Sequence, residues 1–244
     1  MVGYPFRAGK SAGRVQDVRV ITIDLDDTLW AVGPVIVRAE QRLKDWYREH
    51  YPRIVEQVTR ESARELRVQV FEEHADRAYD LTFIRREFIR RIGEAAGYAS
   101  IDVDAAFAVF DEARNDLELF PDVRPALKSL RTRFRLVAVT NGNASLEKVG
   151  IDDLFDGFVS ARSAGAAKPE PVIFDAAVEA GGASRDQTLH IGDHPEMDVD
   201  GARRSGLHAV WVNRDGSAWP AELREPDGVV NDLHELETLL GGED

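Results

Sequence analysis

The sequence predicts an α/β fold, a Rossmann-like parallel sheet with helices on both faces, plus an inserted all-helical cap domain. Three observations lead to this prediction. The run VITI at 20–23 is typical of a buried strand, and residues 31–117 show helical spacing without a strand signal. From 118 onward, strand and helix patterns alternate, as in a parallel sheet covered by helices. We therefore expect an α/β core at 1–30 and 118–244, and a cap at 31–117 inserted after the first strand.

The predicted cap consists of four helices. Its first helix starts near Pro34, a residue suited to a first helical turn, and carries Val37, Leu43 and Trp46 at helical intervals. The expected helices cover 34–51, 54–74, 80–96 and 103–117, and GYAS is the clearest break between them.

The predicted core continues with alternating elements. The expected strands lie at 135–140, within 155–161, at 187–193 and at 208–213, and the expected helices at 144–150, 169–182, 198–206 and 232–240. The opening strand at 18–23 has no strand near it in the chain. We therefore expect it to join the later sheet.

Composition excludes several classes of function. The chain has 244 residues, is 43% hydrophobic and carries a formal net charge of −13, which argues against nucleic acid or an anionic membrane as a partner. It has no cysteine, so disulfides, thiolate zinc sites and cysteine nucleophiles are excluded. Residues 1–14 lack the apolar run of a signal peptide, and no stretch is long enough to cross a bilayer. We expect a cytoplasmic protein that acts on a small molecule.

Polar residues follow the predicted strands at the ends where open parallel sheets bind ligands. Three acids, Asp24, Asp26 and Asp27, come directly after the first strand. Such closely spaced carboxylates raise each other's pKa unless a cation lies between them. Later strand ends and loops add further polar residues, namely Thr140, Asn141, Lys168, Asp193 and Asp198.

This set of residues predicts a magnesium-assisted reaction. Hard oxygen ligands without histidine or cysteine favour Mg²⁺, which commonly shares its ligand shell with a substrate phosphate. Lys168 supplies a second positive charge. One carboxylate can then act as the nucleophile, while a neighbour two residues away transfers the proton.

Four stretches resemble, in order, the motifs of the haloacid dehalogenase-like (HAD) hydrolase superfamily: DLDDT at 24–28, TN at 140–141, Lys168, and GDHPEMD at 192–198. The helical block between the first two resembles the C1 cap of that superfamily. Within it, the chain is similar to bacterial flavin-pathway phosphatases, which act on FMN and on 5-amino-6-(5-phospho-D-ribitylamino)uracil.

The resemblance implies a role for each motif residue. Asp24 attacks phosphorus and forms an aspartyl-phosphate, and Asp26 protonates the leaving group and then deprotonates the hydrolytic water. Thr140 and the Asn141 amide hold phosphate oxygens, and Lys168 offsets the negative charge. The implied Mg²⁺ ligands are the Asp24 carboxylate, the Asp26 backbone carbonyl and Asp193. Asp198 is implied to be either a further ligand or a residue that contacts a ligand.

Simpler interpretations remain for several residues. Asp198 could be a helix N-cap, and His194 and Asp27 are expected to face solvent. Arg86 and Arg90 share a helical face that is expected to be solvated, although an arginine there could contact a phosphorylated substrate. Trp30 is expected to pack inside the protein, with stacking on a substrate ring as the alternative.

Other functions also remain open. The resemblance is compatible with a phosphatase for another sugar phosphate or nucleotide, a haloacid dehalogenase, a phosphomutase, or a binding module without chemistry. Dehalogenases of this superfamily attack carbon, need no metal and lack the acid/base aspartate. Asp26, Asp193 and Asp198 therefore favour a Mg²⁺-dependent phosphatase.

Overall fold

The computed structural model describes residues 17–241, and the expected absence of a signal peptide at 1–14 lies outside that range. It confirms the predicted α/β fold class, with an all-parallel sheet in the order β3-β2-β1-β4-β5-β6. The strands are β1 (Val20–Ile23), β2 (Arg135–Thr140), β3 (Gly157–Ser160), β4 (Thr188–Gly192), β5 (His208–Val212) and β6 (Gly228–Val230). The opening strand lies in the middle of the sheet, where Val20 pairs with both Arg135 and Thr188.

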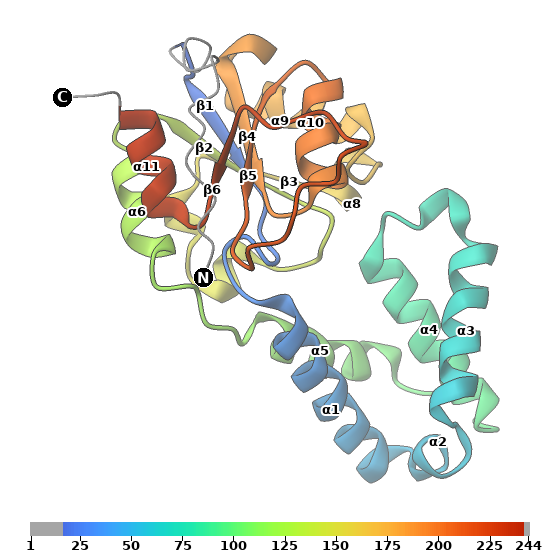
Figure 1. The fold of residues 1–244 in the computed structure, drawn as a ribbon. Coiled ribbons are helices and arrows are strands. Elements are labelled where there is room, and N and C mark those ends of the chain that lie inside the picture. The colour runs from blue at the N-terminus through green and yellow to red at the C-terminus, as the bar shows by residue number, and fades with distance from the viewer. Residues whose placement is uncertain (1–16, 242–244) are drawn as a thin grey trace.

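Helices cover both faces of the sheet (Figure 1). On one face, α6 (Val123–Leu130) and α11 (Leu233–Gly241) pack on Ile21 and Ile23 of β1. On the other, α9 (Pro171–Gly181) and α10 (Gly201–Arg204) pack on β2 and on Val20. The short helices α7 (Leu146–Val149) and α8 (Ala161–Ala164), a π-helical turn at Pro195–Asp200, and 3₁₀ turns at Ala75–Arg77, Asp152–Leu154 and Arg185–Gln187 complete the elements.

The segment between β1 and α6 is helical and extends away from the sheet (Figure 1). It contains α1 (Val32–His50), α2 (Pro52–Gln57), α3 (Arg60–Glu73), α4 (Leu81–Ala95) and α5 (Val103–Asn115). These helices have a hydrophobic core of their own, in which Leu43, Phe88 and Phe110 are buried. Among the helices of residues 17–241, none is both long and apolar enough to span a bilayer.

Several elements differ from the sequence expectations. The single helix expected at 54–74 is two helices, because Val58 is extended and the Thr59 side chain caps α3 by accepting a hydrogen bond from the Ser62 amide. Strand β6 was not predicted, since its three residues are too few to show a period of two.

Candidate active site

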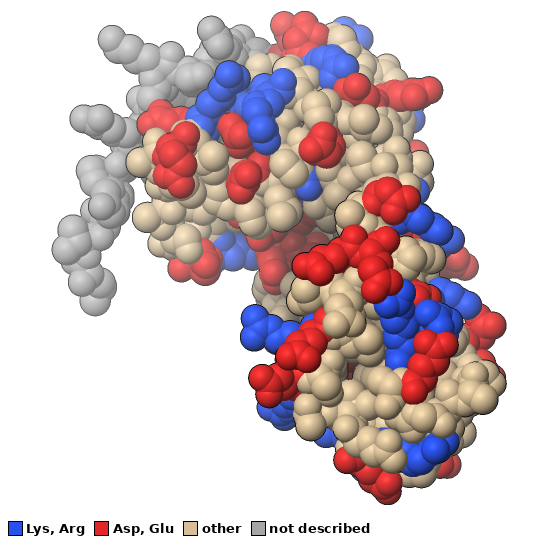
Figure 2. Space-filling model, turned by 90° about the vertical axis from the view of Figure 1, so that its right-hand side faces the viewer, with Lys and Arg blue, Asp and Glu red and all other residues tan. Residues whose placement is uncertain are grey.

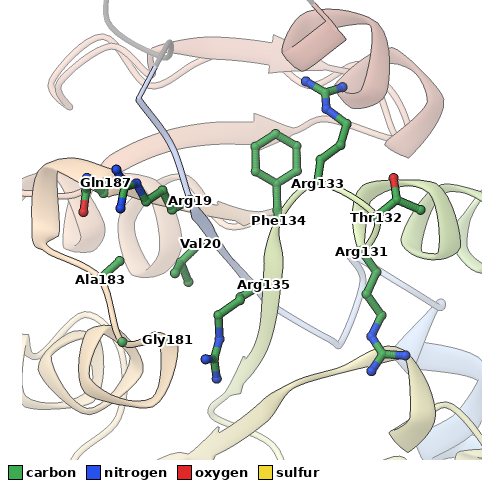
Figure 3. Close-up of a pocket in the computed structure, with 11 residues that line it drawn as sticks. Arg19, Val20, Arg131, Thr132, Arg133, Phe134, Arg135, Gly181, Ala183 and Gln187 are labelled. Atoms are coloured by element: carbon green, nitrogen blue, oxygen red, sulfur yellow. The ribbon is translucent and has the colours of Figure 1, made fainter.

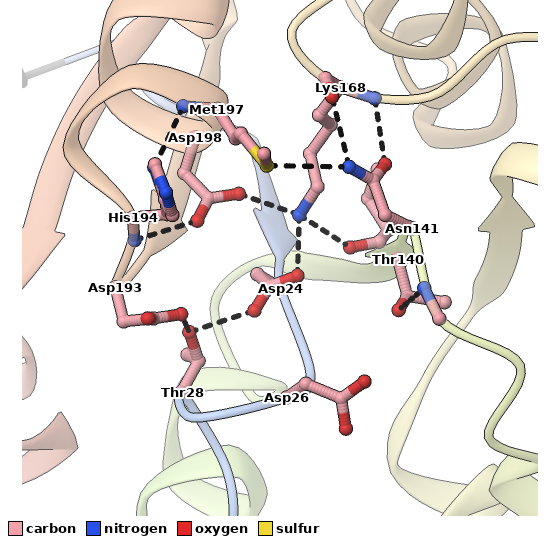
Figure 4. Close-up of polar contacts among 12 residues, drawn as sticks. Asp24, Asp26, Thr28, Thr140, Asn141, Lys168, Asp193, His194, Met197 and Asp198 are labelled. Atoms are coloured by element: carbon pink, nitrogen blue, oxygen red, sulfur yellow. Dashed lines mark hydrogen bonds and ion pairs between the residues drawn. The ribbon is translucent and has the colours of Figure 1, made fainter. Parts of the chain in front are cut away.

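The carboxyl ends of β1, β2 and β4 bring the motif residues together (Figure 4). They lie on the side of the sheet that faces the helices α1 to α5, called the cap below (Figure 1). Asp24 follows β1, Thr140 ends β2, and Asp193 follows β4. Since β1 lies between β2 and β4, these three positions are neighbours. Lys168, from the loop before α9, reaches the same place and pairs with the Asp24 carboxylate.

Lys168 lies between two buried acids. Its ammonium donates to Asp24 Oδ1 and, at 2.6 Å, to Asp198 Oδ1, and its side chain is only 2% exposed. Asn141 fixes the lysine backbone, because its side-chain amide accepts from the Lys168 amide at 2.7 Å and donates to the Lys168 carbonyl at 2.9 Å. The structure therefore gives the Asn141 side chain a positioning contact that the motif pattern did not predict.

The Thr28 hydroxyl lies between the carboxylates of Asp24 and Asp193. It lies 3.0 Å from Asp24 Oδ2 and 3.1 Å from Asp193 Oδ1, and Thr28 is completely buried. Thr28 belongs to the first motif, but the sequence assigned it no role. Its position shows that it orients both carboxylates.

The acids outnumber the positive charges around them. Burial raises the pKa of Asp24 well above its usual range, the Lys168 ammonium opposes this, and the neighbouring acids add to it. Burial, together with the charge of Asp198, raises the pKa of Asp193 to about 6. The carboxylates of Asp24, Asp193 and Asp198 each offer an oxygen within 4.8 Å of the others, a group that could hold a metal ion. An all-oxygen donor set of this kind fits Mg²⁺.

Asp198 is not a helix N-cap. The π-helical turn begins at Pro195 with His194 as its cap, so Asp198 lies inside the turn, where it accepts from the His194 amide at 2.9 Å. Burial opposes the charge of Asp198, but Lys168 and His190 hold its pKa well below the usual range. Gly192 makes room for it, because a Cβ there would lie 2.3 Å from Asp198 Cγ.

The Asp26 carboxylate points away from Asp24 (Figure 4) and has partners of its own. Arg114 Nη2, from the last turn of α5, donates to its two oxygens at 2.6 and 2.7 Å, and Trp30 Nε1 donates to Oδ1 at 2.8 Å. No sequence motif marks Arg114. Trp30 is fully buried, so it packs inside the protein as expected, and the alternative of stacking on a substrate ring is wrong.

Thr140, Asp27 and His194 differ in how far they are buried. The Thr140 side chain is buried at the strand end, and its hydroxyl accepts from the Gly142 amide at 2.8 Å. Asp27 is exposed in a left-handed turn (φ 60°), where it accepts from the Val32 amide. His194 is also exposed, as expected.

Two side chains, one on β5 and one just after it, hold the backbone of the loops that carry Asp193 and Thr28. Trp211 Nε1 donates to the Asp193 carbonyl at 2.7 Å. Arg214 donates to the Thr28 carbonyl at 2.9 Å and forms a two-pronged ion pair with Asp122 at 3.0 and 2.8 Å. These contacts hold the Asp193 and Thr28 backbones in place.

A cavity of about 310 Å³ opens next to Asp26, between the core and the cap. Figure 2 shows a hollow between the part of the molecule that contains the sheet and the helical part, with acidic side chains inside it. Cap side chains, including Phe71, Phe88 and Phe110, give the cavity an apolar wall, and Arg67 and Arg85 also line it. The cavity therefore combines an apolar wall with a few charged side chains, as small-molecule sites do.

Arg85, rather than Arg86 or Arg90, faces this cavity. Its side chain is 14% exposed, pairs with Glu40 at 2.6 Å, and lies 3.8 Å from the Phe110 ring centroid. Arg86 pairs with Asp104 and Arg90 with Glu87 and Glu94, with side chains 38% and 44% exposed, as on a solvated face.

A second cavity, of about 350 Å³, lies at the opposite end of the sheet, where β1 and β2 begin (Figure 3). Arg19, Arg131, Arg133 and Arg135 line it, and its described lining contains no carboxylate. It therefore has none of the acid-rich chemistry of the site at the other end of the sheet.

Comparisons with known proteins agree with this geometry. Residues 18–206 match the family described as haloacid dehalogenase-like hydrolase. The chain is 32% identical over 231 residues to the 5-amino-6-(5-phospho-D-ribitylamino)uracil phosphatase YigB of Escherichia coli (strain K12), covering 91% of this chain and 96% of that one. It is 31% identical over 222 residues to the glyceraldehyde 3-phosphate phosphatase of Methanopyrus kandleri (strain AV19), covering 87% and 91%.

A crystal structure of a 2-haloacid dehalogenase from Pseudomonas syringae pv. Tomato DC3000 has the same fold, with a TM-score of 0.87 at 35% identity over 92% of this chain and 98% of that one. The family match covers all four motifs, from the strand before Asp24 to the turn that holds Asp198. The resemblance inferred from those motifs is thus confirmed, and this chain is an enzyme of the haloacid dehalogenase-like hydrolase family.

Proposed function

We propose that the protein is a Mg²⁺-dependent phosphatase that hydrolyses a small-molecule phosphate monoester through an aspartyl-phosphate on Asp24. The observation that carries this proposal is the cluster of Asp24, Asp193 and Asp198, whose oxygens lie within 4.8 Å of one another, with Lys168 bonded to two of them. In phosphoryl transfer, positioning and charge neutralisation supply most of the catalysis, and this cluster is arranged for both.

Two displacements at phosphorus complete the proposed reaction. In the first, an Asp24 oxygen bonds to phosphorus, the ester bond breaks, and Asp26 gives its proton to the departing oxygen. In the second, water attacks phosphorus, Asp26 takes a proton from it, and the bond to Asp24 breaks with its electron pair returning to the carboxylate. Thr140 and the Asn141 amide hold phosphate oxygens.

Charge at the site is shared between the chain and the metal. Lys168 stabilises the Asp24 carboxylate and the phosphoryl oxygens. Mg²⁺ would be held by the Asp24 and Asp193 carboxylates and the Asp26 carbonyl, and would neutralise phosphate charge when bound. Asp198 would either bind the metal directly or contact a group that does. The helices at 31–117 act as the cap that shapes the leaving-group site.

For the substrate we propose a ribityl phosphate of the flavin pathway, 5-amino-6-(5-phospho-D-ribitylamino)uracil or FMN, encountered in the cytoplasm. The likeness to YigB supports this choice. So does the aromatic wall of the cavity beside Asp26, since flat rings pack well against phenylalanine. Another sugar phosphate is the alternative, supported by the likeness to a glyceraldehyde 3-phosphate phosphatase.

Dehalogenation is the second candidate function, and the 35% identity to a 2-haloacid dehalogenase favours it. Displacement at carbon would leave two features of the site without use: the acid Asp26 and the metal-suited group of Asp193 and Asp198. Turnover of a chloroacid that persists in EDTA would establish this candidate in place of the phosphatase.

A phosphatase screen tests the proposal directly. Purified protein is incubated with Mg²⁺ and a panel of metabolite phosphates that includes FMN, sugar phosphates and nucleotides, and released phosphate is measured. We expect turnover that EDTA abolishes and that is highest for the ribityl phosphates. A folded protein inert toward the whole panel would contradict the proposal, and dependence on an added sugar bisphosphate would indicate a phosphomutase.

Replacing Arg85 tests whether the cap cavity binds the leaving group. We expect Arg85→Met to raise KM for the best substrate about tenfold, the equivalent of one hydrogen bond to a charged group. The matched control is Arg86→Met, one residue away on the same helix, where the side chain pairs with Asp104 outside the cavity and KM should not change. Equal KM values for the two variants would exclude Arg85 from substrate binding.

A further inference from the structure

We propose that Arg114, a cap residue outside every motif, is the positioning residue that makes Oδ2 of Asp26 the proton-transfer atom. This inference rests on the proposed phosphatase function. It concerns a direct contact between the cap and the proposed machinery, because Arg114 lies in the last turn of α5 whereas Asp26 follows β1.

The two carboxylate oxygens of Asp26 have different numbers of hydrogen-bond donors. Oδ1 accepts from both Trp30 Nε1 at 2.8 Å and Arg114 Nη2 at 2.6 Å, so its two lone pairs are used. Oδ2 accepts only from Arg114 Nη2, at 2.7 Å, among the described residues. One lone pair of Oδ2 is therefore left to take or give a proton.

Oδ2 also adjoins the loop after β2, which carries the proposed phosphate contacts. A Cβ added to Gly142 would be 2.5 Å from Asp26 Oδ2 and 3.2 Å from Thr140 Oγ1, so both oxygens adjoin the same point of the loop after β2. Thr140 is the residue proposed to hold a phosphate oxygen. The contacts of Arg114 thus leave the free lone pair of Asp26 beside the loop that carries the proposed phosphate contacts.

Arg114 is held in place at the wall of the cavity beside Asp26. Its side chain is 1% exposed, and Nη1 is buried without a hydrogen-bond partner among residues 17–241. The next residue, Asn115, ties the end of α5 to the core by accepting from the Ser145 amide at 2.7 Å. A buried arginine with an unsatisfied nitrogen is costly, and its contact with Asp26 is the one ion pair it makes within residues 17–241.

The step that depends most on this orientation is hydrolysis of the aspartyl-phosphate. The attacking water loses a proton to Asp26 Oδ2 as its oxygen bonds to phosphorus, and the Asp24–phosphorus bond breaks with its electrons returning to Asp24. With p-nitrophenyl phosphate, the first displacement needs little protonation because nitrophenolate leaves readily. This substrate therefore separates the two uses of Asp26.

The test measures Arg114→Met with p-nitrophenyl phosphate and Mg²⁺ in the steady state and by rapid mixing. We expect kcat to fall about 30-fold or more while kcat/KM stays within about threefold, because only the second displacement slows. Rapid mixing should show a burst of about one nitrophenolate per active site as the aspartyl-phosphate accumulates. Arg114→Lys should restore part of kcat, and it carries the test if the methionine variant fails to fold.

The controls separate this inference from simpler ones. Arg86→Met, a partly exposed arginine of the same cap, should match the wild type. A purely structural role for Arg114 would lower kcat without a burst and leave KM unchanged, because fewer molecules would be active; that result would overturn the inference. A wild-type protein that does not hydrolyse p-nitrophenyl phosphate at all would instead contradict the proposed function.

Discussion

Asp24→Asn should abolish phosphatase turnover and leave the protein folded. An amide cannot form the aspartyl-phosphate, so we expect kcat/KM to fall by on the order of 10⁴-fold or more. Stability should not suffer, because burial raises the pKa of Asp24, which means that the folded protein disfavours its charged form. Asparagine removes that charge, and Lys168 keeps Asp198 as a partner at 2.6 Å.

Two measurements decide this prediction. The first is phosphate release with Mg²⁺, comparing wild type and Asp24→Asn on the substrate with the highest turnover. The second is thermal unfolding, where we expect the variant to melt at the same temperature as the wild type or higher, as is common when a functional charge is removed. Near-wild-type turnover in the variant would exclude Asp24 as the nucleophile.

The sequence was informative where chemistry lies at strand ends. Asp24, Thr140 and Asp193 each directly follow or end a strand of recognisable β-branched and apolar residues, and parallel strands bring those ends to one edge of the sheet. Both the fold class and the grouping of these side chains could therefore be predicted from spacing and alternation.

The cap contacts could not be predicted in the same way. Arg85 and Arg86 are adjacent on α4, and only packing against α5 decides that Arg85 faces the cavity and lies over Phe110. Arg114, in the last turn of α5, lies 91 positions after Ile23, the last residue of β1. No periodic pattern relates Arg114 to Asp26. Side chains that act through tertiary contacts between distant elements leave no local signal.

Lys168→Met should remove activity and also destabilise the protein. Lys168 is the ammonium between Asp24 and Asp198, whose side chains are only 9% and 2% exposed. Methionine fills similar space but leaves two buried carboxylates without a cation. Breaking a buried ion pair by removing one partner costs about 3–5 kcal/mol, so we expect the free energy of unfolding to fall by about that amount without Mg²⁺.

The matched control is Lys128→Met on the exposed face of α6, which should change neither turnover nor stability. Chemical denaturation at neutral pH, with and without Mg²⁺, measures the loss, and we expect Mg²⁺ to stabilise the variant because the cation binds only to the folded group of acids. A variant as stable as wild type without Mg²⁺ would show that the acids do not depend on Lys168.

The stability difference between wild type and the Lys168 variant should depend on pH. In the wild type, burial raises the pKa of Asp24, and burial with the charge of Asp198 raises the pKa of Asp193 to about 6, so both groups favour the folded state as the pH falls from neutral toward 5. Lys168 and His190 hold the pKa of Asp198 below its usual range, so this acid adds nothing over that interval. Without the lysine, burial and mutual repulsion dominate, and Asp24 and Asp198 take up protons more readily when folded than when unfolded. Lowering the pH from neutral toward 5 should therefore narrow the difference in the free energy of unfolding between wild type and Lys168→Met, and a difference that does not change with pH would mean that Lys168 does not control the protonation of these acids.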